Sequence, residues 1–365
     1  MNHSAGSFAL PQEVHTTLPQ EVHISYIHTI TTIKTPDHMN YRPFGNTDLN
    51  VSEVGFGAWA IGGPAMAGDI PIGWGDVDDA TSEKALKRAL ELGINFYDTA
   101  DFYGLGHSEE LIGKVFGNRN DVLIASKVGH RLAGDGSIFL DYSREHILNS
   151  CEGSLKRLGR DTIDFYQLHT AKIPDLENGE SVEAMEQLKR EGKIRWWGVS
   201  LNTFKPGPEA DFMFSHNAGH GFQLVLNIIN QEALGIVDRA HKAGYGVIAR
   251  MPLQFGLLTG KFTKATRFPE DDHRIFRLPP DILDESLDAL EKVWPLADKY
   301  GITKTELAMS FILSFEGVST VIPGIKTPEQ AEKNTSGIVK LSPGDRDLIR
   351  SLYMPEFREI LFRMK

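Results

Sequence analysis

Cysteine is nearly absent from this chain of 365 residues, which contains one, Cys151. A single cysteine excludes a disulfide within the chain, and a reducing cytoplasm is the simplest compartment for such a protein. No apolar run approaches the about 18 residues that cross a membrane. Runs of Lys or Arg are also absent and the formal net charge is −11, so nucleic acids and anionic membranes are poor partners.

A glycine motif of the Rossmann type is lacking as well. The nearest match, Gly104-Leu-Gly-His-Ser-Glu109, has a glutamate where the third glycine is required. No motif for a flavin or a redox metal replaces it. If the chain binds a nicotinamide cofactor, it therefore binds it without a Rossmann fold.

The first 38 residues differ from the rest of the chain. They repeat one hexapeptide, at Leu10–His15 and Leu18–His23, and have neither the basic start nor the apolar core of a secretory signal. We expect residues 1–38 to be a disordered extension, or an upstream read-through with Met39 as the native start. Residues 39–365 are expected to form a single domain.

From Met39 onward, short apolar runs alternate with amphipathic stretches of helical period. The predicted strands are Val51–Gly57, Asn95–Asp98, Val122–Lys127, Ile163–His169, Arg195–Ser200, Phe222–Asn227, Gly246–Met251 and Val318–Pro323. Strands that are each followed by a helix indicate a parallel sheet with right-handed crossovers. Such a sheet is a (β/α)8 TIM barrel if closed and a doubly wound sheet if open. The chain length, the strand count and the lack of a second domain favour the barrel.

Segments outside this repeat are also recognisable. The turn residues of Phe44–Leu49 predict an N-terminal β-hairpin across the barrel floor. Ala60–Asp78 and Phe262–Leu283 are irregular, and the second is long enough to be an active-site loop. Two extra C-terminal helices are predicted, over Asp345–Tyr353 and Glu356–Met364.

Three successive predicted strands end in ionisable residues, namely Asp98, Lys127 and His169, and Tyr103 follows Asp98 closely. Catalytic groups of a parallel barrel collect at the carboxyl ends of its strands. A tyrosine phenol is a weak acid because its usual pKa is about 10, but a neighbouring lysine cation stabilises the phenolate. Together these residues would form a proton donor aimed at a carbonyl oxygen, and a separate hydride source would be needed beside it.

The stretch Phe96–Gly113 resembles the motif of the aldo-keto reductase family, and the family's tetrad falls on Asp98, Tyr103, Lys127 and His169. The likeness extends from about Tyr41 to Asn334. It implies a barrel that binds NADP(H) across its C-terminal face and transfers a hydride to the carbonyl group of a small aldehyde or ketone.

The same resemblance implies the cofactor-binding residues. They are Ala58 and Trp59 near the nicotinamide ribose, Ser200 and Gln223 at the carboxamide, Arg250 stacked under the nicotinamide, Pro252, Leu253, Gly256, Leu258 and Lys261 over the pyrophosphate, Gly324, Lys326 and Gln330 at the 2′-phosphate, and Asn334 at the adenine. Trp59, Trp74 and His130 are the candidate substrate contacts.

The chain departs from the family pattern at several of these positions. Leu201 replaces the Asn that usually follows Ser200, and Arg250 stands where many members have a Tyr. Gly324 and Gln330 occupy positions that are often Lys and Arg. NADPH is the expected cofactor, and NADH is a credible second one.

Two other functions compete with reduction. Some members of the family are cytoplasmic subunits of potassium channels that retain the cofactor and act mainly by binding. A metal-dependent hydrolase could use Asp98 and His169 as ligands, but the sequence lacks an H-x-H pair at the first strand. The oligomeric state and the physiological substrate stay open.

Overall fold

In the computed structural model, which describes residues 39–68, 70–73, 77–269, 272 and 274–364, eight parallel strands form one sheet. In order across the sheet they are β3 (Phe56–Gly57), β6 (Phe96–Asp98), β7 (Leu123–Val128), β10 (Ile163–His169), β11 (Ile194–Ser200), β12 (Gly221–Val225), β13 (Gly246–Arg250) and β14 (Thr320–Ile322). Parallel bridges from Val54 to Val321 and from Gly57 to Gly324 join the first strand to the last. The predicted (β/α)8 barrel is confirmed.

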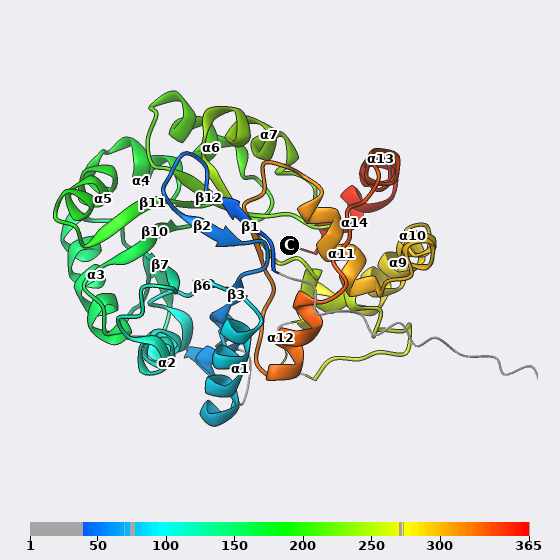
Figure 1. Cartoon of the computed structure of the whole chain (residues 1–365), viewed down its shortest axis with the longest axis horizontal. Coiled ribbons are helices and arrows are strands. Elements are labelled where there is room, and N and C mark those ends of the chain that lie inside the picture. The colour runs from blue at the N-terminus through cyan, green and yellow to red at the C-terminus, as the bar shows by residue number, and fades with distance from the viewer. Residues whose placement is uncertain (1–38, 69, 74–76, 270–271, 273, 365) are drawn as a thin grey trace, which may run out of the picture. The chain divides into compact units, whose positions relative to one another are not determined.

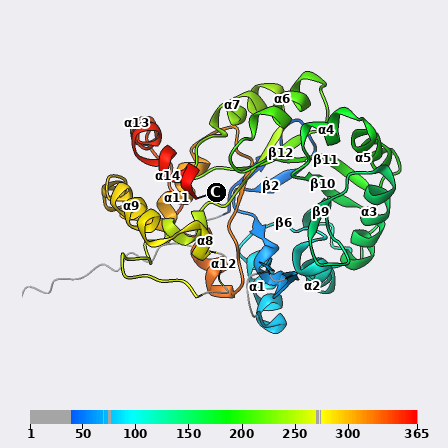
Figure 2. The same ribbon diagram turned by 180° about the vertical axis from the view of Figure 1, so that it is seen from behind.

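A helix follows each strand and packs on the outside of the sheet (Figure 1). These helices are α1 (Asp79–Glu91), α2 (His107–Phe116), α3 (Arg144–Leu158), α5 (Glu180–Arg190), α6 (Gly207–Ser215), α7 (Leu234–Ala243), α11 (Lys304–Leu313) and α12 (Pro328–Thr335). The last of them, α12, packs against the first, α1, as both views show (Figures 1 and 2). The ring of helices therefore closes at the same place as the sheet.

The predicted N-terminal hairpin is present as β1 (Tyr41–Pro43) and β2 (Asn50–Ser52), which pair antiparallel. The ring of Phe44 is fully buried, with its centroid 4.8 Å from that of Phe165. The predicted strand Val51–Gly57 is wrong in extent, because Val51 belongs to β2 and the barrel strand starts at Phe56. The Ser52 hydroxyl donates to the Val54 carbonyl, and this turn separates the two strands.

The segment predicted to be irregular after Phe262 contains helix α8 (Arg274–Arg277) and the start of α9 (Pro280–Leu290), so that prediction was too broad. Figure 2 shows α8 and α9 on the same side of the barrel as α14 (Arg358–Arg363). The predicted C-terminal helices are confirmed as α13 (Pro343–Ser351) and as a π-helical turn, Tyr353–Phe357, that leads into α14.

The remaining described elements are short. They are β4 (Met66–Ala67), β5 (Ile70–Pro71), β8 (His130–Leu132), β9 (Ile138–Leu140), α4 (Ile173–Glu177), α10 (Pro295–Tyr300) and three 3-10 segments, η1 (Ala58–Gly62), η2 (Tyr103–Gly106) and η3 (Gln254–Thr259). No helix in the described part of the chain is both long and apolar enough to pass through a membrane. The predictions for residues 1–38 and for Trp74 lie outside the described residues.

The strand register explains how the barrel presents polar groups at one end. Side chains two positions apart on a strand share a face. On β6, β7 and β10, the inner residues Phe96, Ala125 and Phe165 belong to one buried apolar cluster. Two positions further along each strand are Asp98, Lys127 and Gln167, and His169 follows Gln167 by two. The apolar layer fills the barrel, and the polar layer lies above it at the carboxyl ends of the strands.

Candidate active site

Lys127 is the centre of the polar layer and has no exposed surface. Its ammonium donates to Asp98 Oδ2 at 2.7 Å, to the Thr99 carbonyl at 2.8 Å and to the Tyr103 hydroxyl oxygen at 3.2 Å. Burial disfavours the ammonium, but the charge of Asp98 and the contact with Tyr103 outweigh it and raise the pKa of Lys127. Lys127 is therefore a cation at neutral pH, hydrogen-bonded to a phenol oxygen.

The other carboxylate oxygen of Asp98 is held by two amides. The Gln223 side chain donates to Asp98 Oδ1 at 2.6 Å, and the Gln167 side chain donates to the same oxygen at 3.3 Å. Gln223, which the resemblance assigns to the nicotinamide carboxamide, thus has its amide nitrogen on Asp98. Gln167 was not singled out from the sequence, although its position two residues before His169 places it on the same face of β10.

His169 lies next to Tyr103, with 6.0 Å between the ring centroids and the planes at 82°. Burial, followed by the neighbouring His130 and Lys127, lowers the pKa of His169 well below its usual value, so the imidazole is neutral. Its backbone is fixed at the strand end, because the hydroxyls of Tyr142 and Thr170 both donate to the His169 carbonyl. Thr170 has φ +64°, a rare value for a β-branched residue and one that occurs where the surroundings fix the backbone.

The turn after Tyr103 is left-handed at three successive residues, Gly104 (φ +60°), Leu105 (φ +55°) and Gly106 (φ +104°). A Cβ atom at Gly104 would lie 2.0 Å from the Gly62 carbonyl oxygen in η1. The backbones of η1 and η2 therefore touch, and this contact positions the Tyr103 ring. Trp59, also in η1, has its ring centroid 6.3 Å from that of Tyr103.

Arg250 ends β13 close to this group. Its guanidinium donates to the Leu201 carbonyl at 3.2 Å and to the Thr203 hydroxyl at 3.1 Å. Within the described residues its buried Nε has no partner, and burial lowers the pKa of this arginine. The predicted carboxamide contact Ser200 is buried and pairs in register with both His169 and Gln223 on the neighbouring strands.

The segment after Arg250 has a strained backbone. Met251, Gln254 and Phe255 all have positive φ although none is glycine, and Gly256 has φ +97°. Asn227 braces the turn by donating to the Met251 carbonyl and to Gln254 Oε1. Backbone strain of this kind collects at ligand-binding loops. Of the predicted cofactor residues here, Pro252 and Leu258 are buried, Leu253 and Gly256 are partly buried, and Lys261 is exposed.

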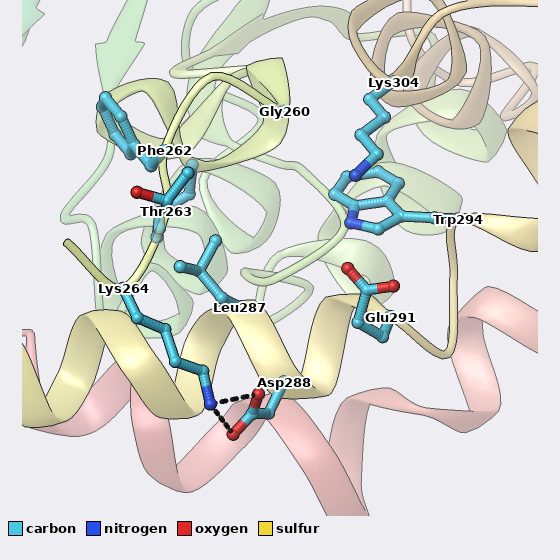
Figure 3. A pocket seen from close by; sticks show the side chains of 10 residues that line it. Gly260, Phe262, Thr263, Lys264, Leu287, Asp288, Glu291, Trp294 and Lys304 are labelled. Carbon is cyan, nitrogen blue, oxygen red and sulfur yellow. Dashed lines mark hydrogen bonds and ion pairs between the residues drawn. The ribbon is translucent and has the colours of Figure 1, made fainter. Parts of the chain in front are cut away.

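A hollow of about 210 Å³ lies beside the end of this loop. Figure 3 shows the side chains that line it. Lys264 forms an ion pair with Asp288 at 2.7 Å, and Lys304 lies 4.7 Å from the centre of the Trp294 ring. Both of these cations are engaged. Lys261 forms no ion pair among the described residues and is the lysine here that a phosphate could recruit.

A further group of predicted residues lies around the start of α12. Gly324, which pairs with Gly57, is exposed, and a Cβ atom there would meet nothing within 4 Å. Gln330 accepts from the Lys326 backbone N–H at 2.7 Å, and the Lys326 ammonium has no ion-pair partner in the described ranges. Asn334 is buried. The open backbone at Gly324 and the two available ammonium groups, Lys326 and Lys261, fit an anionic dinucleotide.

The structure thus brings the four tetrad residues together and places Trp59 and Ser200 beside them. No group of three or more His, Cys, Asp and Glu side chains suited to a metal ion occurs among the described residues. The carboxylate of Asp98 instead accepts hydrogen bonds from a lysine and two side-chain amides.

The barrel and the buried Asp98–Lys127–Tyr103 contact define a class of oxidoreductase, and comparison with known proteins identifies the family. The chain belongs to the aldo/keto reductase family, whose model matches residues 53–353. Members of this family use nicotinamide cofactors and act on small carbonyl compounds.

Several relatives are similar to this chain over most of its length. An NADH-specific methylglyoxal reductase of Escherichia coli is 30% identical over 86% of this chain and 98% of its own. A probable voltage-gated potassium channel subunit beta of Arabidopsis thaliana is 30% identical over 82% of this chain and 91% of its own. The structure of the glycerol dehydrogenase AKR11B4 from Gluconobacter oxydans superposes with a TM-score of 0.73 at 30% identity, over 88% of this chain and 96% of that one.

Proposed function

We propose that this protein reduces aldehydes or ketones to alcohols with NADPH, and that Tyr103 is the general acid. The observation that carries this proposal is the buried ammonium of Lys127, which contacts both Asp98 and the Tyr103 hydroxyl oxygen. Because Lys127 donates to that oxygen, the phenolic hydrogen stays available for a substrate carbonyl. The names of two relatives, a methylglyoxal reductase and a glycerol dehydrogenase, support small oxygenated compounds as substrates.

Each residue of the tetrad has a distinct task in this proposal. Tyr103 donates its proton to the carbonyl oxygen, and Lys127 stabilises the phenolate that remains. Asp98, held by Gln223 and Lys127, keeps the ammonium in place. Neutral His169 has one N–H and orients the carbonyl oxygen beside Tyr103. General acid catalysis of this kind contributes about 10²–10⁴-fold to the rate.

The bound nicotinamide supplies the hydride that the carbonyl carbon receives. Arg250, with its unpartnered Nε, and Ser200 would face the nicotinamide, and Lys261 would neutralise the pyrophosphate. Lys326 is the basic residue that would contact the 2′-phosphate. Gln330 accepts a hydrogen bond from the Lys326 backbone N–H, and Asn334 lies one helical turn after Gln330 in α12. We infer a preference for NADPH with some use of NADH. A single lysine would bind the 2′-phosphate through one charged group, whereas an arginine would bind it with two parallel hydrogen bonds.

A second candidate role is a cofactor-binding regulatory subunit with slow turnover. The similarity to a probable potassium channel subunit beta favours it. In that case NADPH would bind tightly, but carbonyl compounds would be turned over slowly if at all.

The test follows absorbance at 340 nm for purified protein with 4-nitrobenzaldehyde and either NADPH or NADH. Wild type should oxidise NADPH faster than NADH, and Tyr103→Phe should lose at least about 100-fold in kcat while it stays folded. Tyr41→Phe, which alters a tyrosine on the barrel floor, is the matched control and should keep full activity. NADPH binding without turnover would support the subunit role, and a lack of binding would refute the cofactor assignment.

A further inference from the structure

Arg250 is a positive charge at the barrel mouth that the described residues do not neutralise. Its side chain leaves the end of β13, reaches past β12 and donates to the Leu201 carbonyl at 3.2 Å and to the Thr203 hydroxyl at 3.1 Å, both just after β11. Its Nη1 donates to the Met251 sulfur at 3.2 Å. All of these acceptors are uncharged. Within the described ranges Arg250 forms no ion pair, and its buried Nε has no partner.

The other cation of the site, Lys127, has a counter-charge. Its ammonium forms an ion pair with Asp98 at 2.7 Å. The neighbouring His169 and His130 are neutral, because burial lowers the pKa of both rings. An arginine keeps its proton at neutral pH even where burial lowers its pKa, as it does here. The net charge of these five residues is therefore +1, and Arg250 carries it.

The charge of Arg250 acts on the groups that would hold the substrate. After burial, His130 and Lys127, it is a further cause of the lowered pKa of His169. Burial lowers the pKa of Arg250 itself, and negative charge at Tyr103 and Asp98 opposes that effect. Charges inside a protein interact with an effective dielectric constant of about 20, against about 80 in water. A ring that gives a hydride to a carbonyl held by Tyr103 and His169 therefore lies within the field of Arg250.

Hydrogen bonding alone does not explain an arginine at this position. A neutral amide side chain could also donate to the Leu201 carbonyl and the Thr203 hydroxyl. Taking a charge out of water destabilises the fold unless a counter-charge compensates it. A cation kept without a counter-charge beside the proposed proton donor indicates a function in the reaction.

The proposed reduction changes the charge of the nicotinamide. The carbonyl carbon receives a hydride, which is a proton with two electrons, and the carbonyl oxygen receives the proton of Tyr103. The nicotinamide ring is uncharged while it holds this hydride and positively charged once it has given it up. The negative charge left on Tyr103 balances the ring until a proton from solvent restores the phenol. From then on, the charge of Arg250 repels the oxidised ring.

We propose that Arg250 is a specificity-determining residue for the redox state of the cofactor, which weakens the binding of NADP⁺ relative to NADPH. This inference rests on the proposed carbonyl reduction with a nicotinamide cofactor. As a consequence, NADP⁺ leaves readily once the alcohol has formed. The site also fills with NADPH when both forms of the cofactor are present.

The test measures the dissociation constants of NADPH and NADP⁺ without a carbonyl compound. NADPH fluorescence reports the reduced form, and displacement of NADPH reports the oxidised form. The quantity compared is the Kd for NADP⁺ divided by the Kd for NADPH, at one fixed ionic strength. Arg250→Gln removes the charge and keeps an N–H donor, and it should lower this ratio at least about fivefold, the effect of one charge several ångströms away. Arg250→Lys keeps the charge and should retain most of the wild-type ratio.

Lys261→Gln is the matched control, because it also removes one positive charge. Lys261 is the proposed partner of the pyrophosphate, which is the same in both forms of the cofactor. This variant should weaken the binding of both forms and leave their ratio at its wild-type value. Damage to the fold likewise weakens both forms together, so a changed ratio in Arg250→Gln reports the charge.

Two results would count against the inference, and they differ from each other. An unchanged ratio in Arg250→Gln, with both forms still bound, would overturn this inference and leave the reductase intact. A wild type that binds neither NADPH nor NADP⁺ would overturn the cofactor assignment and this inference with it.

Discussion

At the scale of single residues, Lys127 has the largest predicted effect on both stability and activity. Lys127→Met keeps most of the side-chain length but leaves the buried Asp98 carboxylate without its cation. Removing one partner of a buried ion pair costs about 3–5 kcal/mol, so the free energy of unfolding should fall by that amount. Chemical denaturation measures this loss, and the 340 nm assay should show no turnover.

Tyr103→Phe is the comparison that separates the two effects. It removes one hydroxyl from a partly exposed position, and its cost in stability should be within about 1 kcal/mol although activity is lost. If Lys127→Met unfolded at the same denaturant concentration as wild type, the buried contact between Lys127 and Asp98 would be refuted.

The tetrad could be predicted from the sequence because each of its strand residues ends an apolar run. The alternation of side chains then places Asp98, Lys127 and His169 inside the same barrel mouth. The partners of these residues could not be predicted in the same way. Gln223 reaches Asp98 from a strand 125 residues further along the chain, and nothing local to either residue indicates that contact. The edge-on contact of His130 with His169 is likewise a result of how two strand ends meet.

At the scale of elements, the contact between η1 and η2 positions Tyr103. Gly104→Ala should disrupt it, because the residue has positive φ and its Cβ would overlap the Gly62 carbonyl. The left-handed conformation alone costs an L-residue about 1–2 kcal/mol, so we expect at least that loss of stability and a lower kcat from a displaced Tyr103. Thermal unfolding and the 340 nm assay measure the two effects.

A glycine elsewhere serves as the control for this variant. Gly235 lies in α7, and an added Cβ would meet nothing within 4 Å. Gly235→Ala should be neutral or slightly stabilising, since alanine is the better helix former by up to about 1 kcal/mol. Full activity in Gly104→Ala would show that the contact does not position the acid.

The strands and helices could be predicted where the apolar pattern was long and had polar segments at both ends. The strand Ile163–His169 was predicted with its observed ends, because seven residues of one pattern lie between polar segments. The hairpin β8–β9 was missed, since its strands have three residues each and its exposed Ile138 and Phe139 break the usual alternation. Val51–Gly57 was read as one strand because the turn at Ser52 depends on a contact that the local sequence does not indicate. Besides the bond from its hydroxyl to Val54, the Ser52 backbone N–H donates to the side chain of Asn95 on another segment.

At the scale of the whole molecule, the neutral histidines make stability depend on pH. The pKa of His130 is lowered to about 4, and those of His169, His146 and His220 are also lowered, in each case mainly by burial. An unfolded histidine has a pKa of about 6.5, so between pH 6.5 and 4 the unfolded state binds more protons than the folded state. Stability is therefore full above about pH 6.5 and falls as the pH drops towards 4.

His130→Phe removes the contribution of one histidine to this dependence of stability on pH. A shift from 6.5 to about 4 corresponds to at most about 3.4 kcal/mol, and partial exposure of the ring reduces that figure. The raised pKa of Asp101 has the opposite effect, because there the folded state binds a proton more readily than the unfolded state and stability rises as the pH falls. Carboxylates with lowered pKa values, such as Asp141, reduce stability only at lower pH. Urea denaturation of both proteins at pH 7.5 and at pH 4.5 should show a smaller loss in the variant. Equal losses would mean that the pKa of His130 is not lowered in the folded protein.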